Sequence, residues 1–129
     1  KPGLMFELNR LLNGEDMPPE VLGEALFAQE VSTETLRRYM RKMQHESQRA
    51  IWDMSMFNLP MTNRMHATPL LVLGAELDLL IPAFLVQTTA QTYGVHAKIF
   101  HGLGHAVMLE QGWEHAAETI RDWLAGQEV

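Results

Sequence analysis

Two short apolar runs constrain this chain most, because each stops abruptly and is followed by a side chain suited to acid–base chemistry. The first run, Leu70–Leu73, is bounded by Pro69 and Gly74 and shows no alternation of apolar and polar residues. Short, continuously apolar runs are typical of parallel strands that are covered on both faces. The second run, Val95–Phe100, is rich in strand-forming residues and ends shortly before a Gly-x-Gly-His sequence. We therefore predict two parallel strands, each followed by a loop.

A helical pattern follows each predicted strand, which indicates an α/β fold class. Pro82 suits the first turn of a helix and Gly94 suits its end. The apolar face predicted for this helix consists of Phe84, Leu85, Thr88, Thr89 and Tyr93. A last helix is predicted to end near Gly126 and to pack on the sheet through residues at helical spacing, namely Trp113, Ala116, Ala117, Ile120, Trp123 and Leu124.

The residues before Thr68 are predicted to form several short helices. One is predicted over about residues 1 to 13, a second begins at Pro18-Pro19, and a third runs from His45 to Phe57. Between these, Ser32 is placed to cap a helix whose apolar stripe is Leu36, Tyr39, Met40 and Met43. Residues 58 to 68 contain proline and no apolar period, so they indicate a connection. We therefore divide the chain into a helical region, 1–67, and an α/β region, 68–129.

The composition excludes several classes of protein. A net charge of -6 and a pI near 5.4 argue against a nucleic-acid partner. The basic residues Arg37, Arg38, Arg41 and Lys42 therefore favour a solvated helix face over a recognition helix. No apolar run is long enough to cross a membrane, and a cytoplasmic protein is expected. The absence of cysteine excludes disulfides and thiolate metal ligands. The nine methionines suit gap-filling in a core or, as an alternative, an adaptable apolar cavity.

Asp78 and His105 are the candidate acid and base, because both come just after the predicted strands. In parallel sheets, ligands bind outside the carboxyl ends of the strands. A carboxylate that accepts the Nδ1 proton of an imidazole fixes its tautomer and prepares it to remove a proton. Glu76 is an alternative acid two residues from Asp78. Gly102 and Gly104 are expected to let the backbone turn sharply around the histidine.

A metal site is a weaker interpretation of the same stretch. His101 and His105 are four residues apart and Glu110 follows them, as in sites of the His-x-x-x-His type. That motif needs both imidazoles on one helical face, and Gly102 with Gly104 disfavours a helix there. We therefore expect neither a metal nor a cofactor.

Two longer patterns resemble the acid and histidine segments of bacterial α/β-hydrolases. The first is Pro-Leu-Leu-Val-Leu-Gly-Ala-Glu-x-Asp with a following Ile-Pro, and the second is Gly-x-Gly-His-x-x-Met-Leu-Glu-x-x-Trp with a closing Ile-x-x-Trp-Leu. The resemblance spans Thr68–Leu124 and implies Asp78 as triad acid and His105 as triad base. Met108 and Leu109 are candidates for the substrate pocket, with packing under the last helix as the alternative. The helices before Thr68 match the lid of that family by position.

The nucleophile of such a triad is not visible in the sequence. No Gly-x-Ser-x-Gly occurs, and the serines are Ser32, Ser47 and Ser55, all in helical stretches. The family places its nucleophile and oxyanion hole before the lid, so we expect this chain to be the C-terminal part of such an enzyme and to be inactive alone. The expected partners are the N-terminal half, or a second copy through self-association, and a small-molecule substrate.

The resemblance implies a serine-dependent esterase, or a related hydrolase, of small apolar substrates. An aspartate nucleophile, as in dehalogenases and epoxide hydrolases of this fold, would use a histidine in the same place. A different class of function is a non-catalytic binding module, in which the helical region offers a methionine-rich groove.

Overall fold

The computed structural model describes residues 18–43, 47–53, 56, 61–62 and 68–127. The chain forms two compact units. The first comprises Lys1–Ala25 and Val31–Met61, and the second comprises Leu26–Glu30 and Thr62–Val129. The predicted division at residue 67 lies close to this one, except that Leu26–Glu30 joins the second unit.

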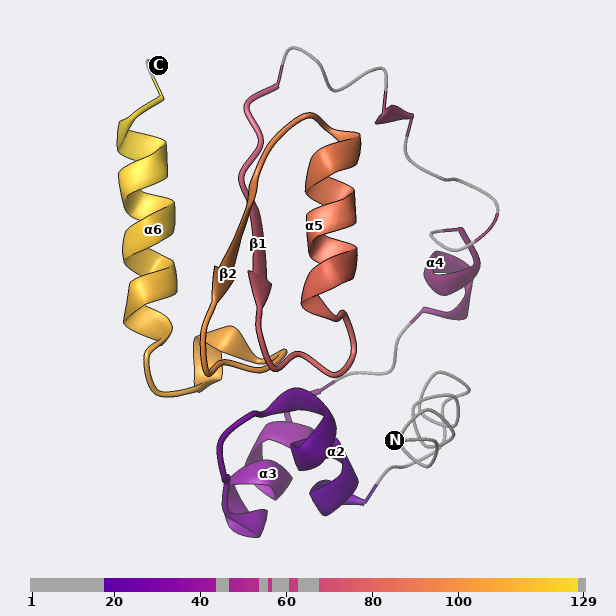
Figure 1. The fold of residues 1–129 in the computed structure, drawn as a ribbon. Coiled ribbons are helices and arrows are strands. Elements are labelled where there is room, and N and C mark those ends of the chain that lie inside the picture. The colour runs from indigo at the N-terminus through magenta and orange to yellow at the C-terminus, as the bar shows by residue number, and fades with distance from the viewer. Residues whose placement is uncertain (1–17, 44–46, 54–55, 57–60, 63–67, 128–129) are drawn as a thin grey trace. The chain divides into compact units, whose positions relative to one another are not determined.

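The first unit contains the helices α2 (Pro19–Leu26), except for its last residue, α3 (Thr33–Met40) and α4 (Gln48–Trp52) (Figure 1). The prediction that Ser32 caps α3 is confirmed, because its Oγ accepts a hydrogen bond from the Thr35 N–H at 3.3 Å. Leu36 is the buried residue of α3, while its basic side chains are exposed. α4 lies within the helix predicted from His45 to Phe57. The helix predicted at residues 1 to 13 lies outside the described residues.

The second unit is built on a parallel pair of strands, β1 (Val72–Ala75) and β2 (Ala97–Phe100). Helix α5 (Ala83–Thr92) connects them, and the strands pair from Val72 with Ala97 to Ala75 with Phe100. The predicted parallel pair and its connecting helix are thus confirmed, and the described chain is a mixed α/β protein.

The prediction that β1 ends at Leu73 is wrong, because the strand continues through Gly74 to Ala75. A Cβ built at Gly74 would come within 2.9 Å of Val86 and 3.0 Å of Ile99, so the missing side chain admits α5 close to the sheet. This approach decides which face of α5 is covered. Val86 and Ala90 are buried, whereas Phe84 is 63% exposed. The apolar face predicted for this helix is therefore wrong.

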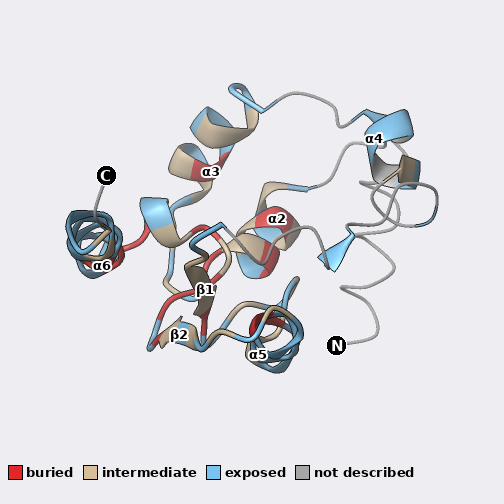
Figure 2. Cartoon of the chain, turned by 90° about the horizontal axis from the view of Figure 1, so that it is seen from above, coloured by how far each residue is buried: buried red, intermediate tan, exposed pale blue. Residues whose placement is uncertain are grey.

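Helix α6 (Trp113–Ala125) lies on the opposite face of the strand pair from α5 (Figure 1). Its predicted bounds are confirmed, and Ala116 packs in one core with Ala75, Phe100 and Leu103. Most of its surface is exposed, as Figure 2 shows. The buried positions are Ala116 and Thr119, so the broad apolar stripe predicted for this helix is only partly covered.

No helix within the described ranges is both long enough and apolar enough to cross a membrane.

Candidate acid–base site

The loops that follow the two strands are held together by main-chain hydrogen bonds. Beyond the last paired residues, the Glu76 N–H donates to the Phe100 carbonyl at 2.9 Å. The Leu77 N–H then donates to the carbonyl of Leu103 at 3.0 Å. These two bonds continue the β1–β2 ladder past the strands. They bring the loop that carries Asp78 alongside the loop that carries His105.

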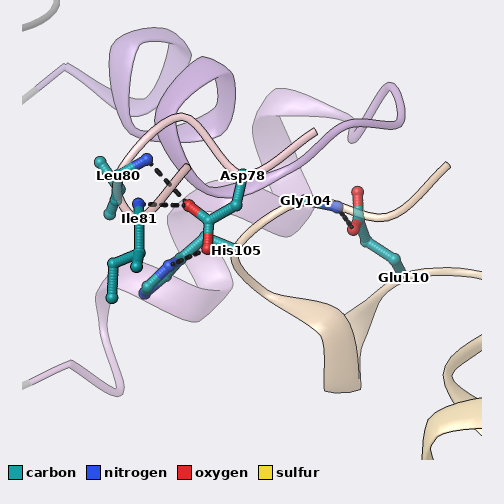
Figure 3. A network of polar contacts seen from close by, with 6 residues as sticks. All are labelled: Asp78, Leu80, Ile81, Gly104, His105 and Glu110. Atoms are coloured by element: carbon teal, nitrogen blue, oxygen red, sulfur yellow. Dashed lines mark hydrogen bonds and ion pairs between the residues drawn. The ribbon is translucent and has the colours of Figure 1, made fainter. Parts of the chain in front are cut away.

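Asp78 and His105 meet directly, with 3.0 Å between Asp78 Oδ2 and His105 Nδ1 (Figure 3). The other carboxylate oxygen, Oδ1, accepts hydrogen bonds from the Leu80 and Ile81 N–H groups at 2.8 and 2.9 Å. An ionised carboxylate only accepts hydrogen bonds, so in this contact Nδ1 is the donor and Oδ2 the acceptor. The side chain of Asp78 is 9% exposed and that of His105 is 35% exposed. The pair therefore combines a shielded acid with a base that solvent or a ligand can reach.

Glu76 pairs with a different histidine. Its Oε1 lies 3.3 Å from Nδ1 of His101, whose side chain is 86% exposed, and its Oε2 accepts a hydrogen bond from the Gly102 N–H. The bond from Gly102 and then the contact with His101 lower the pKa of Glu76 below its ordinary value. Glu76 thus anchors the turn at Gly102, where a φ of 71° suits glycine and confirms the sharp turn predicted there.

Gly104 has a different role from the turn predicted for it, since its φ is not positive. A Cβ at this position would lie 2.6 Å from the Ala28 backbone nitrogen and 3.1 Å from the carbonyl oxygen of Leu26. The glycine therefore permits the segment around Ala28 to contact the loop backbone to backbone. No local sequence pattern predicts this contact, because the two segments are far apart along the chain.

Glu110 is the residue that the sequence analysis placed only in a disfavoured metal site. It is 3% exposed, and its Oε1 accepts hydrogen bonds from the N–H groups of Ala28 and Gln29. Its Oε2 accepts one from the Gly104 N–H (Figure 3). The sequence gives one indication that Glu110 is buried, because this acid directly follows the apolar run Val107–Leu109. Among the described residues, no group of three histidine, aspartate or glutamate side chains converges on a point where a metal would bind.

An open hollow of about 230 Å³ lies beside the acid–base pair. Apart from Asp78 and His105, its lining is apolar or glycine and consists of Leu73, Gly74, Ala75, Ile81, Val86, Phe100 and Val107. Met108 and Leu109, the residues predicted for a substrate pocket, do not line this hollow. They are 69% and 46% exposed, next to Val107 in the short helix η3 (Val107–Leu109).

No protein-family model matches the chain, and no curated protein matches it.

The described serines serve as helix caps. Ser32 caps α3, and the Oγ of Ser47 accepts a hydrogen bond from the Ala50 N–H at the start of α4. Neither lies between glycines on a strand-to-helix turn, which is the setting of a hydrolase nucleophile. Ser55 lies outside the described residues.

Proposed function

We propose that the second unit supplies the acid and the base of an α/β-hydrolase that acts on small, apolar acyl esters. The observation that carries this proposal is the 3.0 Å contact between Asp78 Oδ2 and His105 Nδ1 at the carboxyl ends of adjacent parallel strands. A largely shielded acid bonded to Nδ1 of a more exposed imidazole is an arrangement that suits general-base catalysis.

In the proposed reaction, Nε2 of His105 removes the proton from a nucleophile as it attacks the ester carbonyl. The imidazolium then gives this proton to the departing alcohol. In the second half, Nε2 takes a proton from water as the water attacks the acyl–enzyme. The imidazolium then returns this proton to the nucleophile oxygen as the carboxylic acid leaves, which restores the enzyme. Asp78 keeps the proton on Nδ1 and stabilises the imidazolium, while its bonds from Leu80 and Ile81 hold the carboxylate in place. The proposed nucleophile is a serine other than Ser32, Ser47 and Ser55, the serines of this chain.

The hollow beside the pair supports the choice of a small, apolar acyl group. Apart from the acid–base pair, its lining has no charged or titratable side chain, so a charged group placed against that lining would lose solvation without gaining a partner. Short-chain esters have no such charge to desolvate.

The test is hydrolysis of p-nitrophenyl butyrate by the full-length protein and by two histidine variants. His105→Ala removes the base and is expected to lower kcat by at least about 10²-fold. His101→Ala is the matched control, because this histidine is four residues away and exposed, and it is expected to retain the wild-type rate. Equal rates for the wild-type protein and His105→Ala would refute a catalytic role for the pair and favour a non-catalytic binding function.

The nucleophile class is read from the mass of the intact protein after incubation with a fluorophosphonate. A serine activated by His105 displaces fluoride and gains the phosphonyl group, and His105→Ala is expected to gain it far more slowly. A wild-type protein that hydrolyses esters without gaining this mass would point to the aspartate-nucleophile reactions of the same fold.

A further inference from the structure

The segment Leu26–Glu30, here called the strap, lies against the loop that carries His105. This histidine loop comprises residues 101 to 111. The Ala106 N–H donates to the Leu26 carbonyl at 2.8 Å. Gln29 and Gln111 exchange two further bonds, in which the Gln29 side-chain amide donates to the Gln111 carbonyl and accepts from the Gln111 N–H, at 3.0 and 2.9 Å. The strap therefore contacts the histidine loop directly after His105, at Ala106, and again at the end of the loop, at Gln111.

Glu110 lies at the centre of this contact. Its buried carboxylate gathers the N–H groups of Ala28 and Gln29 from the strap and that of Gly104 from the loop. Burying a carboxylate is costly unless its oxygens accept hydrogen bonds, so these amides and the acid stabilise one another. Gly104 directly precedes His105. The position of the Gly104 main chain therefore fixes the position of the His105 Cα, from which the imidazole extends.

Gly104 allows the strap and the loop to approach closely. The nearest atoms to a Cβ at this position are all backbone atoms of the strap, at 2.6 to 3.1 Å from Ala28, Phe27 and Leu26. Backbone atoms cannot move aside as a flexible side chain does, so the contact tolerates little displacement. The main chain before His105 is thus held by a hydrogen bond on Gly104 and by steric contact with the strap.

We propose that Glu110 is a positioning residue, which holds the histidine loop where Nδ1 of His105 meets Asp78. Glu110 contacts neither side chain of the pair in this structure and acts through Gly104 and the strap. The inference rests on the proposed function for its kinetic readout, and a second readout, the His105 Nδ1 proton, does not depend on activity.

Glu110→Gln is the informative change because it has nearly the same size and removes one acceptor. The site around Oε1 holds two N–H donors and the site around Oε2 holds one. The single amide oxygen of glutamine is expected to face the two strap donors, which turns its NH₂ group toward the Gly104 N–H. Two donors then face each other at the residue that precedes His105, while the strap keeps its bonds.

The experiment compares the full-length wild-type protein with Glu110→Gln and with Glu114→Gln, a matched change at an exposed glutamate of α6. Proton NMR follows the Nδ1 proton of His105, which is slow to exchange while Asp78 accepts it. We expect this signal in the wild-type protein and in Glu114→Gln, and its loss or broadening in Glu110→Gln. In ester hydrolysis we expect kcat of Glu110→Gln to fall about 10²-fold, with little change in KM. A purely structural role would change the melting temperature and leave both readouts of the folded protein unaltered.

Two outcomes separate the inference from the proposed function. A wild-type protein that shows the bonded proton but no hydrolysis refutes the proposed function, while the proton signal of Glu110→Gln still decides the role of Glu110. An unchanged signal and unchanged kcat in folded Glu110→Gln overturn the inference. If Glu110→Gln does not fold, Glu110→Asp replaces it, because a carboxylate one methylene shorter cannot reach all three amides at once. Persistence of the wild-type proton signal in Glu110→Asp would equally overturn the inference.

Discussion

Asp78→Asn separates the two roles of the Asp78 side chain. The amide oxygen of asparagine can still accept the bonds from Leu80 and Ile81, so the turn after β1 is expected to remain. The amide nitrogen then takes the place of Oδ2, 3.0 Å from His105 Nδ1. Because this nitrogen is a donor, Nδ1 must present its lone pair, and the ring proton moves to Nε2. The variant therefore inverts the tautomer of the base in a folded protein.

The expected magnitudes differ for catalysis and stability. An imidazole that carries its proton on Nε2 cannot act as base there, and the same change in an established Asp–His pair lowers kcat by about 10⁴-fold. That loss corresponds to about 5.4 kcal/mol of transition-state stabilisation. The free energy of unfolding is expected to fall by only about 1 kcal/mol, because a bond to a charged acceptor is replaced by a neutral one. Inverting the tautomer of His105 should thus lower the rate far more than it lowers the stability.

Three measurements test this prediction on the full-length protein. Nitrogen-15 NMR of His105 gives the tautomer, hydrolysis of p-nitrophenyl butyrate gives kcat, and denaturant unfolding gives the change in stability. Asp122→Asn is the matched control, since this exposed aspartate pairs only with its neighbour Arg121 among the described side chains. An Asp78→Asn protein that hydrolyses the ester within tenfold of the wild-type rate would refute the reasoning, as would one that keeps the proton on Nδ1.

Two further predictions concern the packing and the turn around the site. Gly74→Ala is expected to destabilise the protein by about 1 to 3 kcal/mol, since the new Cβ would lie 2.9 Å from Val86. Thermal unfolding of the double variant should show that Val86→Ala partly restores the lost stability. Additive losses from the two substitutions would contradict the proposed clash. The lowered pKa of Glu76 means that its stabilising bond from Gly102 is present above the ordinary glutamate pKa of about 4.5 and is lost as the pH falls through the lower, folded-state pKa. The melting temperatures of the wild-type protein and Glu76→Gln should therefore converge below that pH, and a constant difference would show that ionisation of Glu76 is not involved.

The sequence predicted the parallel pair of strands because each short apolar run lies next to clear turn residues. It misplaced the end of β1 because glycine has two uses. A glycine after an apolar run predicts the end of a strand, whereas Gly74 leaves room, by its missing side chain, for Val86 to approach. The choice between these uses depends on a residue twelve positions away in α5. The covered face of that helix was misjudged for the same reason, since apolar residues occur on more than one of its faces.

The site, too, has residues that the sequence predicts and one that it does not. The positions of Asp78 and His105 after two strands were enough to expect them at one edge, and the structure places their side chains in contact. The role of Glu110 was not accessible from the sequence, because two of its three donors lie 82 and 81 residues away. The role of such a carboxylate depends on main-chain amides that are distant in the sequence, and a local sequence pattern cannot show that these amides surround it.

The two main-chain bonds that extend the β1–β2 ladder, from Glu76 to Phe100 and from Leu77 to Leu103, make the distance between acid and base independent of the crossover. Asp78 and His105 are 27 positions apart and all of α5 lies between them, yet both bonds are formed at the strand ends. Insertions or deletions near the far end of that helix, around Gly94, would leave this registration intact. The end of the crossover near Gly94 is therefore free to change in length, whereas its start, which holds Asp78 and packs Val86 on Gly74, is not.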